Sequence, residues 1–405
     1  MVDRCHTGTP PWCVVATAAS ERIQPRDQGR RAEAIFQRFG INANVRSRGR
    51  LDLELRCLVR LGRELLRTGR CPTSLGWGRR LSAWRHGFHP LSAAIYGLEA
   101  GTPGLHPDLY LGDLDWAYHS YRLNGFWNPI LTNKLVMARV LAARGLPHPP
   151  VLGVVTRGRL MAINADPNPE SQELSTWMAN AHTLVFRPHW SGGGEGVFFL
   201  SRDGDPWRIN GHAASFDEVQ LLIGSLDRYL VTAFVEQAAY ARRIQPSTTN
   251  TLRILTLADE GGPFLASAVH RFGTAASYPV DNFHGGLGLC AAVDVARETL
   301  GVAVGLDGQQ RRKQHRYHPE TGSRIEGVAI PGLRQALEGV LAAARCLPEA
   351  ICVGWDVLIT DGGYTLIEAN SPPGIVANQT HTALLADPRA ARMFRRHGLG
   401  VGRTG

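Results

Sequence analysis

The sequence predicts an α+β protein in which most strands pair antiparallel. Apolar stretches of strand length and amphipathic stretches of helix length mix along the chain, without the regular strand–helix–strand alternation of a parallel sheet. Hairpins are frequent, because strand-length stretches follow one another across short turns. With 405 residues and 44% hydrophobic content, the chain is long enough for two or three lobes.

Residues 1–110 are expected to form a helical, arginine-rich N-terminal region. Apolar residues recur at three- and four-residue intervals in residues 28–39 and 51–67, and residues 79–98 predict a further helix. Nothing in this region resembles a catalytic cluster. We expect its helices to dock on the main body of the protein, or alternatively on a partner.

Residues 111–182 are expected to link this region to the rest of the chain. Asn133 predicts the N-cap of a helix over residues 134–144, and Gly145 with the prolines beyond it predicts the end of that helix. Residues 151–155 and 159–163 are then expected to form the two strands of a hairpin, with its turn at residues 156–158. The polar segment 164–175 is expected to be a connection.

The third and fourth predicted regions, residues 183–235 and 236–405, carry most of the strands. In residues 183–235 we expect strands at 183–188, 197–201, near Trp207 and at 229–235, with a glycine loop after the first and a helix at 215–227. In residues 236–405 we expect strands at 251–258, 264–272 and 287–293, a helix at 331–345 and a C-terminal hairpin.

Composition excludes several classes of protein. No run of about 18 uncharged apolar residues predicts a membrane span, and the N-terminus has no pattern of a secretory signal, so we expect a cytoplasmic protein. The seven cysteines show no metal-site spacing, and their odd number argues against a fully paired disulfide framework. The net charge of +9 permits a polyanionic partner such as a nucleotide, a phosphate-bearing carrier or a lipid surface, but in the absence of a nucleic-acid-binding motif we expect no nucleic-acid partner.

Lysine is rare in this basic chain. Of the 44 basic residues only Lys134 and Lys313 are lysines, so the other 42 (44 minus 2) are arginines. A position that keeps lysine is a candidate for a role that needs a compact ammonium rather than a planar guanidinium. Lys134 is therefore a candidate binding residue, with chance as the competing explanation.

The C-terminal hairpin, residues 354–374, predicts a magnesium site. If residues 361–363 form its loop, Thr360 pairs with Tyr364 and Asp356 falls opposite Glu368. Asn370 shares the face of Glu368, because strand side chains alternate with a period of two. Two acids opposite each other repel unless a cation lies between them, and three hard oxygen donors suit Mg²⁺. The alternative is a surface hairpin with solvated acids.

A glycine loop follows the strand at 183–188. The segment 191–196, with four glycines, lies between two apolar strands, and Arg187 precedes it. Such a loop can turn several backbone N–H groups toward a phosphate. It lacks the GK[ST] of a Walker loop and is followed by a strand rather than a helix. The alternative is an ordinary turn.

Several motifs occur together in one order. They are a lysine at a helix start, a basic residue before the glycine hairpin, YLVTAFVEQ, NTLRILTL, YPVDNFHGGLGLCAAVD and GWDVLITDGGYTLIEANSPPG. This order resembles the ATP-grasp superfamily and, more specifically, its sugar-transfer-associated family, which is related to α-L-glutamate ligase-like proteins. The resemblance covers residues 110–390.

The resemblance implies two α+β lobes that clamp ATP, preceded by the helical N-terminal region. Its implied nucleotide-binding residues are Lys134 and Arg187 at the phosphates, the flap glycines Gly192, Gly193, Gly194 and Gly196, and the hinge Thr232, Ala233, Phe234, Val235 and Glu236. It implies that Mg²⁺ is held by Asp356, Glu368 and Asn370. Arg253 and Asn250 would flank the transferring group, and Asp281, Asn282, Gly285 and Gly286 would lie close to the acceptor. Arg271 is a candidate catalytic residue with two roles open, a bidentate contact to a substrate carboxylate and an ordinary ion pair at the end of a strand.

Two positions depart from the family pattern. Arg187 stands where most ATP-grasp proteins carry lysine, and arginine is still a competent phosphate ligand. Ala233 stands where the hinge commonly has an acid, which leaves ribose recognition and nucleotide preference open.

The leading functional interpretation is an ATP- and Mg²⁺-dependent ligase. It would join a carboxylate to an amine through an acyl phosphate, on small-molecule, peptide or sugar substrates of polysaccharide or natural-product assembly. One alternative is a kinase-like transfer to a hydroxyl group. The other is a non-catalytic, basic polyanion-binding protein. The sequence indicates neither the substrates nor the oligomeric state.

Overall fold

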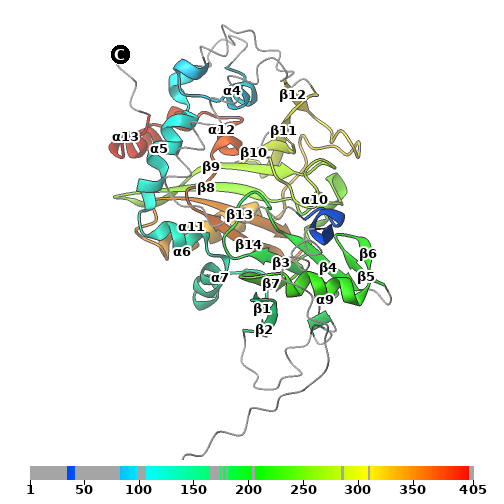
Figure 1. Cartoon of the computed structure of the whole chain (residues 1–405). Helices are drawn as coiled ribbons and strands as arrows, with labels where there is room; N and C mark the ends of the chain where they lie inside the picture. The colour runs from blue at the N-terminus through cyan, green and yellow to red at the C-terminus, as the bar shows by residue number, and fades with distance from the viewer. Residues whose placement is uncertain are drawn as a thin grey trace, which may run out of the picture.

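The structure is a computed structural model that describes residues 34–41, 83–98, 106–163, 174, 177–178, 181–202, 206–283, 287–308 and 311–400. Two seven-stranded sheets form its framework, one above the other in Figure 1. Every pairing between their strands is antiparallel. The α+β prediction is therefore confirmed.

The first sheet has the strand order β2-β1-β7-β3-β4-β5-β6. Its strands are β1 (Val151–Thr156), β2 (Arg159–Ala162), β3 (Thr183–Pro188), β4 (Phe198–Arg202), β5 (Trp207–Ile209), β6 (His212–Ala214) and β7 (Tyr229–Ala233). Helix α9 (Phe216–Gly224) begins after Ser215, which forms a capping box with Glu218. This helix packs on one face of the sheet and leaves the alternate side chains of β3, such as Arg187, on the other face.

The second sheet has the strand order β12-β11-β10-β9-β8-β13-β14. Its strands are β8 (Leu252–Asp259), β9 (Gly262–Phe272), β10 (Leu289–Asp294), β11 (Thr299–Leu306), β12 (Arg312–His315), β13 (Cys352–Thr360) and β14 (Gly363–Asn370). The fully buried Trp355 of β13 lies in the largest core cluster, and its indole N–H donates to Thr256.

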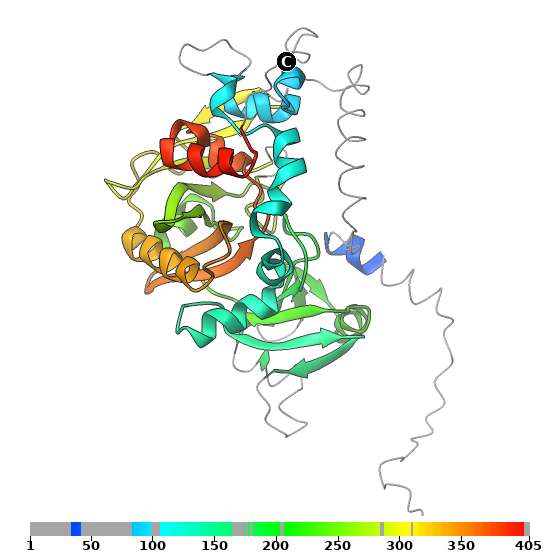
Figure 2. The same cartoon turned by 90° about the vertical axis from the view of Figure 1, so that its left-hand side faces the viewer.

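Helices cover both faces of the second sheet. Helix α11 (Leu333–Arg345) packs on one face against Trp355 and its neighbours. On the other face lie α4 (Pro90–Tyr96), α12 (Val376–Gln379) and α13 (Pro388–Arg396). Figure 2 shows α11 in orange and α13 in red on opposite sides of this sheet.

Three helices connect the N-terminal part to the first sheet, α5 (Asp113–Asn124), α6 (Trp127–Thr132) and α7 (Lys134–Ala143). A buried hydrogen-bond network ties α5 and α6 to the end of the C-terminal hairpin. Asn124 donates to Ser371, Ser371 donates to Asn128, and Cys352 donates its N–H to Asn124. The segment that follows β14 is thereby held in place.

The prediction of a single helix over residues 79–98 is wrong for residues 83–98, the part of this range that the structure describes. A short helical turn over 83–85 ends at Gly87, which has a φ of +79°, and α4 begins anew at Pro90. Left-handed backbone and proline both interrupt a helix. Residues 34–38 are helical, as predicted, and Phe39 is buried against the first sheet. The helix predicted at 51–67 lies outside the described residues.

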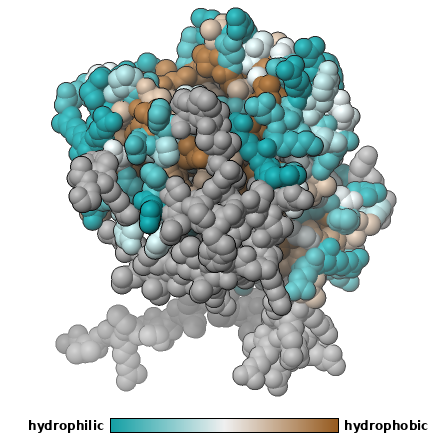
Figure 3. Space-filling view, turned by 90° about the horizontal axis from the view of Figure 1, so that it is seen from above, coloured by the Kyte–Doolittle hydropathy of each residue, from teal (hydrophilic) through white to brown (hydrophobic). Residues whose placement is uncertain are grey.

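The visible surface carries both apolar and hydrophilic side chains (Figure 3), and the described cysteines are free. Seen from above, apolar side chains gather near the centre of the visible face and hydrophilic ones at its margin (Figure 3). Within the described residues, no helix is long and apolar enough to cross a membrane. Cys290, Cys346 and Cys352 are free thiols.

Candidate active site

A cleft lies between the two sheets. Strands β3, β4 and β7 line one side of it, and β9, β13 and β14 line the other. The space inside it, counting the part that is open to solvent, is about 870 Å³. Thirteen predicted site residues line it, Lys134, Arg187, Gly193, Gly194, Thr232, Ala233, Phe234, Val235, Arg271, Asp281, Asn282, Asp356 and Glu368.

The two acids of the C-terminal hairpin lie opposite each other, as the sequence predicts. Asp356 on β13 pairs with Glu368 on β14. Because directly paired residues project from the same face of a sheet, both carboxylates reach the cleft. Asn370 pairs with Gly354 two residues further along.

The turn of this hairpin is one residue shorter than predicted. Thr360 pairs with Gly363 rather than with Tyr364, so only Asp361 and Gly362 form the loop. Asp-Gly is a favoured pair in two-residue hairpin loops. That register alone would move the acids apart, but a bulge at Ile367 adds the missing residue and restores their pairing.

Lys134 connects the hairpin to the glycine loop. Asn133 caps helix α7 by accepting two backbone N–H bonds, which places Lys134 at the first helical position. Its Nζ donates to the Ser191 carbonyl at 2.8 Å and lies 3.3 Å from Glu368 Oε2. The side chain is only 6% exposed. A buried ammonium thus lies between a carboxylate and the loop that the sequence predicts to cover phosphates.

Arg187 enters the cleft from β3. Its Nη1 donates to the Ile367 carbonyl at 3.1 Å, while its buried Nε has no hydrogen-bond partner among the described residues. Burial lowers the pKa of Arg187, although Glu368 acts in the opposite direction. A buried donor without an acceptor is costly, so an anion that accepted this N–H would be favoured.

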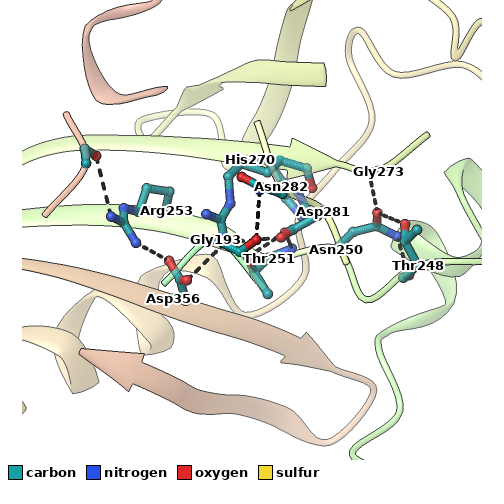
Figure 4. A network of polar contacts seen from close by, with 12 residues as sticks. Gly193, Thr248, Asn250, Thr251, Arg253, His270, Gly273, Asp281, Asn282 and Asp356 are labelled. Atoms are coloured by element: carbon teal, nitrogen blue, oxygen red, sulfur yellow. Dashed lines mark hydrogen bonds and ion pairs between the residues drawn. The ribbon is translucent and has the colours of Figure 1, made fainter. Parts of the chain in front are cut away.

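Asp356 is held between two arginines. Arg253 Nη1 lies 2.6 Å from one carboxylate oxygen (Figure 4), and Arg271 Nη2 lies 3.1 Å from the other. Burial raises the pKa of Asp356, but the charges of Arg271 and Arg253 outweigh it and lower the pKa to about 2. Asp356 is therefore ionised at neutral pH. The Nε atoms of both arginines are buried without a partner among the described residues.

Asp281 extends the same network. Its Oδ1 lies 3.2 Å from Arg271 Nη2, and its Oδ2 accepts from the backbone N–H and the hydroxyl of Thr251 (Figure 4). Burial raises the pKa of Asp281 to about 6, against the opposing effect of Arg271. One arginine thus bridges two carboxylates that both line the cleft.

The glycine loop has a backbone that only glycine adopts easily. Gly193, Gly194 and Gly196 have φ values of +65°, +76° and +73°. The carbonyl of Gly193 accepts from Asn282 Nδ2 at 2.8 Å, and a Cβ on Gly194 would lie 2.5 Å from Val280. The loop therefore rests against the segment of the second sheet that carries Asp281.

The predicted hinge borders the cleft with Thr232, Ala233, Phe234 and Val235. The ring of Phe234 meets that of Phe199 edge to face at 5.7 Å. Its backbone N–H donates to the Thr183 carbonyl at 3.0 Å and so is already paired. Glu236 forms an ion pair with Arg242 outside the cleft lining.

Six predicted residues that the structure describes do not line the cleft: Gly192, Gly196, Glu236, Asn250, Arg253 and Asn370. Asn250 is 1% exposed, and its amide bonds Gln237, Gln245 and the backbone of Thr248 and Gly273. Its position indicates that it shapes the loop beside the cleft. Gly285 and Gly286 lie outside the described residues.

The prediction omitted ten residues that line the cleft, Pro149, Val185, Ser191, Val197, Phe199, Thr249, Thr251, Val280, Leu358 and Ile367. Two could have been found from strand alternation, because Val185 is two residues before Arg187 and Leu358 is two residues after Asp356. Apolar side chains on the same face as charged ones give the cleft the mixed lining that is common in small-molecule sites.

The donor set fits a magnesium nucleotide. Asp356 and Glu368 offer hard carboxylate oxygens to the cleft, whereas Asn370, the third predicted ligand, does not line it and donates its Nδ2 to the Gly354 carbonyl. No group of three or more His, Cys, Asp or Glu that could hold a metal occurs among the described residues. The magnesium set therefore depends on two carboxylates and an amide.

Comparison with solved structures finds similar chains of low identity and low TM-score. No curated protein matches the chain. D-alanine–D-alanine ligase from Bacillus anthracis in complex with ATP is 14% identical, with a TM-score of 0.33, over 65% of this chain and 60% of that chain. D-alanyl-alanine synthetase A from Vibrio cholerae is 12% identical, with a TM-score of 0.35, over 77% and 70%. L-amino acid ligase from Bacillus licheniformis is 12% identical, with a TM-score of 0.33, over 63% and 47%.

The family model for sugar-transfer associated ATP-grasp proteins matches residues 119–389. That range contains both sheets, the glycine loop and the acidic hairpin. The fold is therefore ATP-grasp, and the chain belongs to the sugar-transfer associated ATP-grasp family.

Proposed function

We propose that this protein is an ATP- and Mg²⁺-dependent ligase that joins a carboxylate to an amine in an amide or peptide-type bond. One observation carries the proposal. Lys134, Arg187, Asp356 and Glu368, from a helix and three strands, converge on one cleft beneath the glycine loop. Buried cations and hard oxygen donors at one place are what a magnesium triphosphate requires.

The nucleotide would lie across the cleft, with its base near the hinge and its phosphates near Lys134. The apolar side chains of Val185, Phe199 and Leu358 offer flat contacts to the base. Lys134 and the orphaned Nε of Arg187 would bind phosphate oxygens. Mg²⁺ would be held by Asp356, Glu368 and Asn370.

Bound MgATP would supply a phosphoryl group that activates the carboxylate as an acyl phosphate, which the amine then displaces. Arg271, which lines the cleft, would position the carboxylate with its buried Nε, which has no partner among the described residues, and Arg253 would act beside it by holding Asp356. Phosphoryl transfer needs positioning and charge neutralisation more than covalent help. The charges already present here provide both.

Water must be kept from an acyl phosphate. The glycine loop lies over the cleft, with Gly193 bonded to Asn282 of the connection between β9 and β10. A closing loop of this kind excludes solvent and strengthens the electrostatic interactions beneath it. The closure supports a ligase over a simple binding protein.

The substrates we propose are small-molecule, peptide or sugar carboxylates and amines used in polysaccharide or natural-product biosynthesis. We expect no nucleic-acid partner, and the four-region division of the chain remains a prediction. A kinase-like transfer to a hydroxyl would use the same nucleotide residues. Its product would differ, since the phosphoryl group would stay on the acceptor.

The test is a phosphate-release screen with ATP and Mg²⁺ against pairs of carboxylates and amines. The wild type should release phosphate only when both partners are present, and Glu368→Gln should lose about a hundredfold or more in rate, as expected when a charge stabilising the transition state is removed. Glu338→Gln, on the exposed face of α11, is the matched control. Turnover that persists in Glu368→Gln refutes the metal role, and a phosphorylated acceptor without a second partner supports the kinase.

A further inference from the structure

Residues 278–282, in the connection between β9 and β10, contact two loops of the first sheet at three points. Tyr278 Oη donates to the Asn210 carbonyl at 2.9 Å, and Asn282 Nδ2 donates to the Gly193 carbonyl at 2.8 Å. Between them Val280 fills the space above Gly194, where a Cβ would lie 2.5 Å from its Cγ2. We call Tyr278, Val280 and Asn282 the clasp.

The clasp residues alternate with a residue that faces the other way. Positions 278, 280 and 282 contact the first sheet, whereas Asp281 bonds Thr251 and Arg271 of the second. Residues 275–279 form a turn, and Val280, which follows the turn, forms an isolated bridge with Thr249. The segment is therefore anchored on one sheet by Asp281 while its neighbours hold the other.

Both places that the clasp touches shape the nucleotide cleft. Asn210, in the left-handed region at φ +49°, accepts from the backbone N–H of Phe199 and donates to the Phe39 carbonyl. Phe199 lines the cleft. Tyr278 thus holds the turn that positions an aromatic wall of the base pocket.

The second place is the glycine loop. Asn282 holds the carbonyl of Gly193, and Lys134 holds the carbonyl of Ser191, two residues earlier. The loop is therefore fixed from both ends of the cleft. The contact from Asn282 is the one that joins the glycine loop to the segment that carries Asp281, whereas Lys134 belongs to helix α7.

We propose that the clasp closes the cleft and controls nucleotide exchange, so that ATP enters and leaves only while Tyr278 and Asn282 are detached from the first sheet. The inference rests on the proposed nucleotide site.

The test is stopped-flow binding of the fluorescent analogue mant-ATP with Mg²⁺ to the full chain. Tyr278→Phe removes only the hydroxyl, and Asn282→Ala removes the amide. Each lost hydrogen bond should raise the association and dissociation rates by roughly two- to tenfold, with the dissociation constant changing much less. Tyr317→Phe, at a tyrosine 57% exposed, is the matched control and should leave both rates unchanged.

Association rates in both variants that equal those of the wild type would overturn the clasp. So would a rise in the dissociation rate alone, because that describes a contact to bound nucleotide rather than a gate. If mant-ATP binds to none of the proteins, the proposed nucleotide site itself is wrong.

Hydrogen exchange in the absence of nucleotide distinguishes failure of the clasp from failure of the proposed nucleotide site. In the ligand-free protein, backbone amides of residues 190–199 and 210–212 should exchange several-fold faster in Tyr278→Phe/Asn282→Ala than in the wild type. Unchanged exchange there would contradict the clasp, whatever the result with mant-ATP.

Discussion

Lys134 Nζ lies 3.3 Å from Glu368 Oε2, so the first residue of a helix and a strand near the C-terminus share one buried ion pair. The pair joins the two parts of the site that the sequence predicted separately. In the nucleotide complex, the ammonium and the carboxylate are expected to separate toward phosphate and metal. Their proximity without ligand keeps each charge compensated.

Replacing Lys134 tests whether the compact ammonium is needed. Lys134→Met should weaken ATP binding by about ten- to a hundredfold, because it removes a charged hydrogen bond to phosphate and leaves Glu368 unpaired. Lys134→Arg should also bind ATP weakly. The Lys134 side chain is only 6% exposed, and the larger guanidinium group would have to fit into the same buried space. Equilibrium titration with ATP measures both. Wild-type affinity in Lys134→Arg would show that any cation suffices.

Two neighbouring glycines give a matched pair for the loop. Gly194→Ala should weaken nucleotide binding, because φ is +76° and the new Cβ would meet Val280 at 2.5 Å; left-handed backbone alone costs a non-glycine residue about 1–3 kcal/mol. Gly192→Ala should be tolerated, since no atom lies within 4 Å of its Cβ position. Equal affinity of the two variants in an ATP titration would argue against a defined loop conformation.

Asn250 distinguishes a structural from a catalytic role. Asn250→Ala should lower the free energy of unfolding by about 2–4 kcal/mol, because it leaves several buried backbone and side-chain groups unpaired. Urea unfolding checks this. A variant of normal stability with no turnover would instead restore the catalytic role that the sequence suggested.

His270 makes stability depend on pH. Burial lowers its pKa to about 3, and the neutral ring bonds Tyr240 and the Arg271 carbonyl. The unfolded chain, with a histidine pKa of about 6.5, takes up a proton that the folded protein cannot. The stabilising contribution is therefore present above about pH 6.5 and is lost as the pH falls toward 3, by about 1.4 kcal/mol per pH unit.

The control for this pH dependence is the double variant His270→Phe/Tyr240→Phe, which removes the titrating ring and its partner together. Its free energy of unfolding should fall less steeply between pH 6.5 and 5 than that of the wild type. Identical slopes in the two proteins would show that His270 does not titrate on unfolding.

The sequence predicted those helices and strands that carry a signal in their own residues. Asn133 before helix α7 and the apolar run of β3 carry their own signals, a cap and a strand of high β-propensity. Strand β12 (Arg312–His315) carries none, since its residues are all polar, and it pairs only because β11 offers an edge. Such an element follows from tertiary context.

The site was predictable where chemistry demanded unusual residues. Asp356 and Glu368 were recognisable because paired acids need a cation, although their register depends on a bulge that no sequence rule placed. Asn250 looked functional from its motif, yet its amide is used by the backbone around it. Motifs identify which residues matter more reliably than they assign what each one contacts.

The most direct test is calorimetric titration of ATP into the protein with Mg²⁺ and with EDTA. We expect tight binding with Mg²⁺ and at least tenfold weaker binding in EDTA. Glu368→Gln should lose this difference, while Glu338→Gln should keep it. ATP binding that is equally strong without a divalent ion, or a metal dependence that survives in Glu368→Gln, would contradict the assignment of a magnesium nucleotide to this cleft.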